Sequence, residues 1–294
     1  MDEFEIQRFH WSATSGHPSN THPVESLPVK NIQATGLRPV VFDKTFQMMT
    51  ALILGRKLSG FIDYEEWLLK HVSGMIKVKS VISDKEVYLP ENEFYKEVKE
   101  RVVTIEEAYE ELGKKQITEN ELEKLSLSNA ASTLRNISVT TSDTQYGTNS
   151  NLIECPMYYN SHYGFRAPAL NQSKHVIYSF WPRQSEYMIG CHYVFSSKFC
   201  IKCYNCENIT RCFEVSDSNN CSDCYFCHNC DNVSNSMFCF NVKSKRYAIA
   251  NVEVGRKQYM KIREIVLNEI VGKLERDKML EIDIYNLQLE PRSK

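Results

Sequence analysis

From Ala167 to Val242 every third residue is small or apolar, and the residues between are mostly polar. A β-strand alternates with period two and a helix repeats every 3.6 residues, so neither element explains a step of three. Short extended pieces joined by tight corners do explain it, because one side chain then points inward at each step. The pattern predicts a mainly β fold, a parallel β-solenoid with coils stacked about 4.8 Å apart. This three-residue lattice includes Ala167, Leu170, Ser173, Val176, Ser179, Pro182, Ser185, Met188, Val194, Ser197, Ile209, Val215, Ser218, Val233, Ser236 and Val242, with cysteines between them.

Longer repeats within the lattice leave the coil length open. The pattern of 197–206 recurs at 218–227, an offset of 21, and that of 203–210 recurs at 227–234, an offset of 24. We therefore expect coils of slightly varying length, as solenoids often have. Weaker matches upstream place the start of the cysteine-rich solenoid near residue 127, and we assign it residues 127–254.

Residues 41–126 show helical and strand patterns and predict a small α+β domain. Asp43 is a candidate N-cap for a helix through Arg56 that should be buried nearly all round. Asp63 is the candidate cap of a second helix, 64–72. The remaining predicted elements are a β-hairpin of 76–81 and 86–89 and charged helices at about 91–101, 104–113 and 118–126.

Residues 255–294 predict a capping helix and a tail. Arg256 to Asp277 carries an apolar stripe, and covering the exposed end of the last coil is the plain role for such a helix. Use of the stripe to bind a partner is the alternative. Residues 280–289 could add one strand.

Residues 1–40 are rich in Ser, Thr, Pro, Asn and His, which predicts an extended N-terminal arm that becomes ordered only by binding something. His10, His17 and His22 have spacings that fit no chelating element, so we interpret them as solvated side chains.

Composition excludes several classes of protein. The chain has 294 residues and a formal net charge of −2, which gives no global attraction to nucleic acid or anionic membranes. Its start, Met1-Asp2-Glu3, is acidic where an export signal is basic, and no apolar run is long enough to span a bilayer. We therefore expect a reducing cytoplasm, or a virus particle if the protein is viral, and no membrane contact.

Ten of the eleven cysteines lie between residues 191 and 242, at spacings of three, six or nine. Two interpretations compete. Cysteines that fill a core as small hydrophobes can exchange with Val, Ile and Ser at equivalent positions, as they do here, so we favour a structural role without a cofactor. The alternative is a zinc or iron–sulfur site, because thiolates at this spacing are typical ligands. Its candidate ligands are Cys200, Cys203, Cys206, Cys221, Cys224, Cys227 and Cys230.

No catalytic motif emerges from the sequence, and we expect no enzyme. Glu106, Glu107, Glu110 and Glu111 predict a solvated helix face, since no partner base lies nearby. His162, His175, His192 and His228 fall off the lattice and should lie at the surface or an edge. Several tyrosines could stack on sugars or bases, but a basic groove is missing, which argues against nucleic acid. They are Tyr158, Tyr159, Tyr163, Tyr178 and Tyr187.

The segments 220–230 (NCSDCYFCHNC) and 239–251 (CFNVKSKRYAIAN), followed by a helix, resemble a family of cysteine-rich repeat β-solenoids from archaea, candidate-phylum bacteria and phages. The resemblance covers about residues 130 to 285 and implies the solenoid fold, with almost no biochemistry. Many relatives carry a zinc ribbon upstream. This chain has no cysteine before Cys155, so that module is missing.

Two functions follow as expectations. The first is a non-enzymatic structural or interaction protein, a rigid component of a larger homo- or hetero-oligomeric assembly such as a virion. Its contacts with other subunits would use the arm and residues 41–126. The alternative is a cysteine-rich metal-binding protein with a redox or regulatory role.

Overall fold

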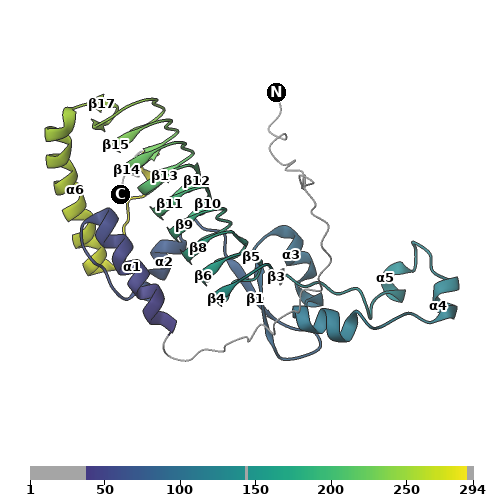
Figure 1. Ribbon diagram of the computed structural model, residues 1–294. Coiled ribbons are helices and arrows are strands. Elements are labelled where there is room, and N and C mark those ends of the chain that lie inside the picture. Colours follow the sequence, from purple (N-terminus) through teal and green to yellow (C-terminus); the bar gives the residue numbers. More distant parts are fainter. Residues whose placement is uncertain (1–37, 143–144, 290–294) are drawn as a thin grey trace, which may run out of the picture. The chain divides into compact units, whose positions relative to one another are not determined.

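The computed structural model describes residues 38–142 and 145–289, and it contains the expected parallel β-solenoid (Figure 1). Nine strands stack along one side in the order β4, β6, β8, β9, β11, β13, β14, β15, β16. The strands of the solenoid are β3 (Gln145–Tyr146), β4 (Ser150–Ile153), β5 (Tyr158–Tyr159), β6 (His162–Phe165), β7 (Leu170–Asn171), β8 (Lys174–Ile177), β9 (Glu186–Ile189), β10 (His192–Phe195), β11 (Lys198–Ile201), β12 (Tyr204–Glu207), β13 (Thr210–Ser216), β14 (Ser222–His228), β15 (Ser234–Met237), β16 (Ala248–Ile249) and β17 (Val252–Glu253).

Each coil from β4 onward is 12 residues long. Lys198 pairs in register with Thr210, Thr210 with Ser222, and Ser222 with Ser234. A coil therefore contains four lattice positions, and the expected variation in coil length does not occur along these strands. The offset of 24 in the sequence is two whole coils, whereas the offset of 21 compares positions on different sides of the solenoid.

The corners have one backbone conformation. From Asn160 to Asn241 every third residue has a positive φ, between 44° and 63°, and it directly precedes an inward residue. Asn and Asp tolerate this left-handed region best, which explains their frequency there. Glycine is favoured at position 190 for a second reason, because a Cβ there would lie 2.8 Å from the carbonyl oxygen of Leu68.

The inward residues form four columns of buried side chains with satisfied polar groups. Ser173 donates its hydroxyl to the Asn171 carbonyl at 2.8 Å and accepts from the Ser185 amide at 3.3 Å. The Cys224 thiol donates to the Ser222 carbonyl at 3.3 Å. Because Ser and Cys pair with backbone while Val needs no partner, the three residue types can exchange within a column.

The outward apolar column on one side is covered by helices α1 (Arg38–Leu54), α2 (Glu65–Leu69) and α6 (Gly255–Asp277) (Figure 1). Its members Ile177, Ile189, Ile201, Phe213, Tyr225 and Met237 are spaced by one coil and belong to one buried cluster with side chains of these helices. Helices α1 and α2 thus share the core of the solenoid, so residues 41–126 do not form the separate domain that the sequence suggested.

Helix α1 corrects two predictions. It begins at Arg38, so Asp43 lies inside the helix, where its carboxylate accepts from the Gly60 amide at 2.7 Å and fixes the following turn. The helix is also not buried all round, because Met48 and Leu52 are about 40% exposed (39% and 43%).

The region before the solenoid contains the predicted hairpin, β1 (Met75–Lys79) antiparallel to β2 (Glu86–Pro90). Coils begin at β3, later than the predicted residue 127. The expected second helix is a 3-10 turn followed by the short α2, without a cap from Asp63, and residues 280–289 contain no strand. The other helical segments are η1 (Phe61–Tyr64), α3 (Glu93–Val98), η2 (Lys99–Arg101), η3 (Glu107–Leu112), α4 (Glu119–Glu123), α5 (Ala130–Thr133) and η4 (Asn286–Gln288).

The last coil is closed by two side chains that take the place of a further coil. Asn251 accepts from the Phe240 amide at 2.8 Å and donates to the Phe240 carbonyl at 2.9 Å. Glu253 accepts from the Arg246 amide at 3.0 Å. The predicted C-terminal helix is present as α6, and its apolar stripe lies along the flank of the solenoid, against the column described above.

The N-terminal arm, with His10, His17 and His22, lies outside the described residues except for its last three positions, 38–40, which begin α1. No helix of the described residues is both long and apolar enough to cross a membrane.

The interchange of Ser, Cys and Val within an inward column makes a prediction for Cys224, which is fully buried. Cys224→Val should change the free energy of unfolding by about 1 kcal/mol or less, whereas Cys224→Asp should cost several kcal/mol by burying an unpaired charge. Urea denaturation measures both. Asn208→Asp, at an exposed corner, is the matched control and should be nearly neutral. Equal damage from Val and Asp at position 224 would contradict the core role.

Candidate functional site

The seven candidate metal ligands point into the solenoid but are divided among its four inward columns. Cys200 and Cys224 share one column, with Cys212 between them. The pairs Cys203 with Cys227 and Cys206 with Cys230 occupy two others, and Cys221 is in the fourth. All eleven cysteines are buried and free of disulfides. Within the described residues, no three His, Cys, Asp or Glu side chains form a group that could hold a metal ion.

The thiols instead contact backbone carbonyls and one another. Cys200 donates to the Lys198 carbonyl at 3.4 Å, and burial raises the pKa of its thiol to about 11. Cys239, near the end of the solenoid, differs: a hydrogen bond with the Cys227 thiol lowers its pKa to about 7. The raised pKa keeps the Cys200 thiol protonated at neutral pH, whereas the Cys239 thiol loses its proton more readily.

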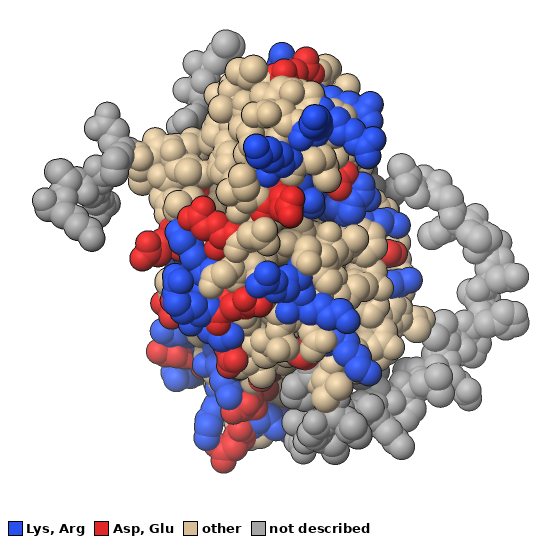
Figure 2. Space-filling model, turned by 90° about the vertical axis from the view of Figure 1, so that its left-hand side faces the viewer, with Lys and Arg blue, Asp and Glu red and all other residues tan. Residues whose placement is uncertain are grey.

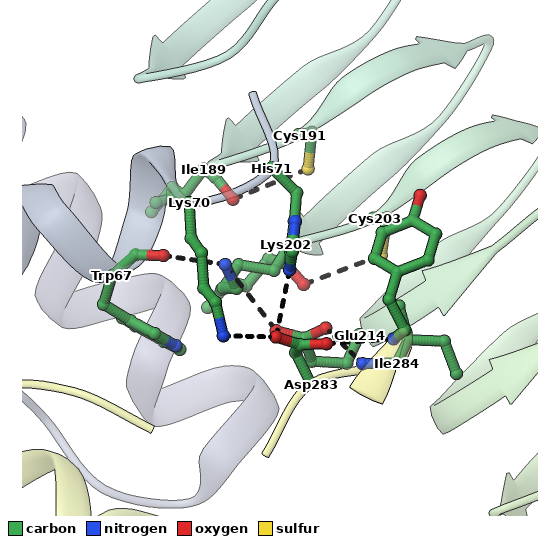
Figure 3. A network of polar contacts seen from close by, with 12 residues as sticks. Trp67, Lys70, His71, Ile189, Cys191, Lys202, Cys203, Glu214, Asp283 and Ile284 are labelled. Carbon is green, nitrogen blue, oxygen red and sulfur yellow. Dashed lines mark hydrogen bonds and ion pairs between the residues drawn. The ribbon is translucent and has the colours of Figure 1, made fainter. Parts of the chain in front are cut away.

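A buried polar network lies where α2 and the segment after α6 meet the solenoid (Figure 3). Lys202 is fully buried, although it lies off the inward lattice, where polar residues are expected to face solvent. Its ammonium donates to the Trp67 carbonyl at 2.7 Å and lies 3.8 Å from the carboxylate of Glu214, one coil further on. Burial lowers the pKa of Lys202 and raises that of Glu214 to about 7.

Asp283 is the most connected member of the network. One carboxylate oxygen accepts from Lys70 at 2.6 Å and lies 2.9 Å from His71, while the other accepts from the amides of Tyr285 and Asn286. Burial alone would raise the pKa of Asp283, but these partners outweigh it and hold the pKa well below its usual range. The carboxylate therefore fastens the C-terminal segment to α2.

Three buried polar atoms beside this network have no hydrogen-bond partner: Nε1 of Trp67, the hydroxyl of Tyr204 and Oε1 of Glu214. Oε1 of Glu214 lies 3.8 Å from the Lys202 ammonium, which also lies 5.9 Å from the centre of the Tyr204 ring. Such groups are commonly satisfied by a buried water molecule. The network has charge and hydrogen-bonding capacity, but within the described residues it contains no nucleophile paired with a base.

A cavity of about 230 Å³ lies between α2, the hairpin and the first coils. The guanidinium of Arg166 spans its wall, bonding Glu65 at 2.7 Å and Glu154 at 2.6 Å. Tyr178 donates to the other oxygen of Glu65 at 2.9 Å. Arg166 thus links the two carboxylates, and these contacts hold α2 against the first coils at the cavity wall.

The off-lattice aromatic residues lie on different sides of the solenoid. Tyr163, His175, Tyr187 and Phe199 stack in one column, with ring centres 4.5 to 4.9 Å apart. Stacked rings turn their edges outward, so they offer little face area to a sugar or base. Tyr178 is buried, whereas Tyr158 and Tyr159 lie on another side. His162, His175, His192 and His228 are half-buried, as expected for edge positions.

Glu107 is the exception among the four glutamates expected on a solvated face. It is buried, and its carboxylate accepts from Ser80 at 2.5 Å, from Ser83 and from the Thr104 amide at 2.9 Å. Burial would raise the pKa of Glu107, but these hydrogen bonds outweigh it and lower the pKa. Glu107 thus holds η3 against the hairpin.

Ion pairs between neighbouring coils follow a spacing that is already present in the sequence. Five of them join residues 12 apart: Glu154 with Arg166, Glu186 with Lys198, Lys202 with Glu214, Arg211 with Asp223, and Asp231 with Lys243. Opposite charges recurring at this one separation would have fixed the coil length. Asp283 has no such signal, because its side-chain partners Lys70 and His71 lie more than 200 residues away.

Searches of protein-family models and of curated proteins found no match to this chain.

The metal alternative has a direct measurement. We predict that the purified protein holds less than one equivalent of zinc or iron, because its thiols are spread over four columns and bonded to carbonyls. Native mass spectrometry and elemental analysis measure this. A stoichiometric metal whose removal by a chelator unfolds the protein would establish the opposite.

The Asp283 network predicts a pH dependence. A carboxyl whose folded pKa is depressed contributes stability above its unfolded pKa of about 3.9, and this is lost as the pH falls toward the folded pKa. Asp283→Asn should lower the free energy of unfolding by about 2 kcal/mol at pH 7. The difference in free energy of unfolding between wild type and variant should narrow between pH 5 and pH 3. Urea denaturation across this range tests it. Asp84→Asn, at an exposed hairpin turn, is the control. A difference in free energy of unfolding that stays constant with pH would show that the charge of Asp283 does not contribute to stability.

Proposed function

We propose that this chain is a non-enzymatic structural protein whose solenoid is a rigid component of a larger assembly. Membership in the cysteine-rich solenoid family remains part of this proposal. The coil of constant length supports it, because uniform stacking gives a stiff rod with each side chain at a fixed height. The shared core of α1, α2 and α6 with the solenoid adds to the stiffness, because the helices pack along one flank of the coils.

The observation that carries the proposal is a segment without a core of its own. Residues 113–136, here called the protrusion, contain α4 and α5, and none of their side chains is buried. In the view of Figure 1, α4 and α5 lie away from the stacked coils. Leu122 and Leu127 are 61% and 98% exposed. Apolar side chains that the fold does not cover commonly mark contacts with other proteins.

The protrusion is nevertheless locally built to be helical. Thr118 and Glu121 form a reciprocal capping box at the start of α4, with the Thr118 amide donating to Glu121 at 2.8 Å. A capped turn without a buried face gains little from its own chain, since packing supplies most helical stability in proteins. Contact with another subunit would supply that packing. The protrusion lies largely within the predicted docking module, residues 41–126.

A reducing cytoplasm or a virus particle is the setting that we propose, because the eleven buried cysteines are free thiols. The competing function, a zinc- or iron-binding redox protein, is decided by the metal measurement described above.

Replacing residues 114–135 with a short Gly/Ser linker should leave the melting temperature within about 2 °C of wild type, since no buried side chain is lost. The same variant should lose its cross-links to neighbouring subunits in material from the native source. Thermal melts and cross-linking with mass spectrometry measure the two effects.

The control for this variant is Leu122→Ser with Leu127→Ser, which keeps the backbone and removes only the apolar contacts. Wild-type protein that forms no cross-link to another chain, or a bound metabolite that turns over, would refute the proposal.

A further inference from the structure

The segments at the two ends of the solenoid carry opposite charge. Residues 104–123 contain seven glutamates against two lysines, and residues 243–261 contain six Lys and Arg against one glutamate. We call these segments the acidic end and the basic end. The acidic end leads into the protrusion before the first coil, whereas the basic end comprises the last coil and the start of α6.

The charges at both ends are exposed and largely unneutralised. Apart from the buried Glu107, the glutamates of the acidic end are exposed, and none forms an ion pair among the described residues. At the basic end, Arg256, Lys257 and Lys261 are exposed and likewise lack an acidic partner within the described part of the chain. Lys and Arg side chains gather at the top of the molecule in Figure 2, which is the height of β17 in Figure 1.

Each end also exposes apolar side chains next to its charges. Tyr109 and Leu122 at the acidic end are 72% and 61% exposed. Val252 and Met260 at the basic end are 62% and 45% exposed. Surfaces that combine complementary charge with exposed apolar groups have the composition of a protein interface.

The two ends cannot satisfy one another within a single molecule. Nine stacked strands separate them, which at about 4.8 Å a coil is roughly 40 Å of rigid solenoid. A second copy presents the missing surface. An interface between two different patches of the same chain is heterologous, so repeating it gives an open filament or a closed ring.

We propose that copies of this chain associate head to tail, the basic end of one copy binding the acidic end and protrusion of the next. This inference rests on the proposed structural function and names its partner. Side-chain contacts hold the copies together, not an added β-strand, because Asn251 and Glu253 already occupy the edge of the last coil.

Sedimentation velocity of the full chain at about 50 mM and 500 mM salt tests the proposal. We expect association that grows with protein concentration and weakens at high salt, where charges are screened beyond about 4 Å. Nuclease treatment should leave it unchanged. A monomer at every concentration in low salt, or association that nuclease abolishes, would overturn head-to-tail binding.

Charge reversal identifies the surfaces. Arg256→Glu with Lys257→Glu, or Glu110→Lys with Glu111→Lys, should each raise the dissociation constant at least about tenfold, or 1.4 kcal/mol. The four changes together restore opposite charges and should return the constant to within about threefold of wild type. The control, Lys44→Glu in α1 with Lys57→Glu in the exposed segment after it, should have no effect. Thermal melts verify that each variant is folded.

Failure of this proposal differs from failure of the structural function. If the chain is monomeric but its protrusion still cross-links to a different protein in native material, head-to-tail binding is wrong and the structural role stands. If association persists and none of the reversals changes it, the copies meet through other surfaces and the inference is wrong.

Discussion

The left-handed residue before every inward side chain is the constraint on which this structure depends. A positive φ at every third position turns the chain at each step, so four steps close a coil and the next coil lies directly above it. Most L-residues resist this conformation, by roughly 1–2 kcal/mol each. The stacking of identical corners must supply that energy. Parallel backbone hydrogen bonds and dense columns of small side chains do so, and this explains why the coil length never varies from β4 onward.

Uniform stacking also sets what the outside of the solenoid can do. Positions 12 residues apart become neighbours, so charges, amides and aromatic rings form ladders along the coils. The Tyr163 to Phe199 stack and the Glu154–Arg166 pair are products of this rule. Where a ladder is apolar, as at Ile177, Ile189 and Ile201, it must be covered. Helices from both ends of the sequence meet there, and the Asp283 network fastens them to the coils.

The same geometry explains why the cysteine side chains fill the interior of the solenoid as separate columns. A metal site needs several ligands that converge on one point, whereas corners at regular intervals divide the cysteines among four columns. Each thiol finds a carbonyl within its own coil, as Cys224 does with Ser222. The contacts that we propose use the parts of the chain that break the regularity, the protrusion and the charged ends.

The sequence by itself determined the solenoid, the inward lattice, the hairpin and the C-terminal helix, because each depends on local periodicity. It also placed Cys224, Val215 and Val233 in the core. Tertiary structure decided the rest. The burial of Lys202 follows from α2 lying over its corner, and Asp283 gains its role from residues more than 200 positions away. Asp43 and Glu107 resembled a helix cap and a solvated acid, yet each binds backbone or hydroxyl groups of a neighbouring segment. Local pattern fixes which way a side chain points, but only the packing of distant segments decides what it meets.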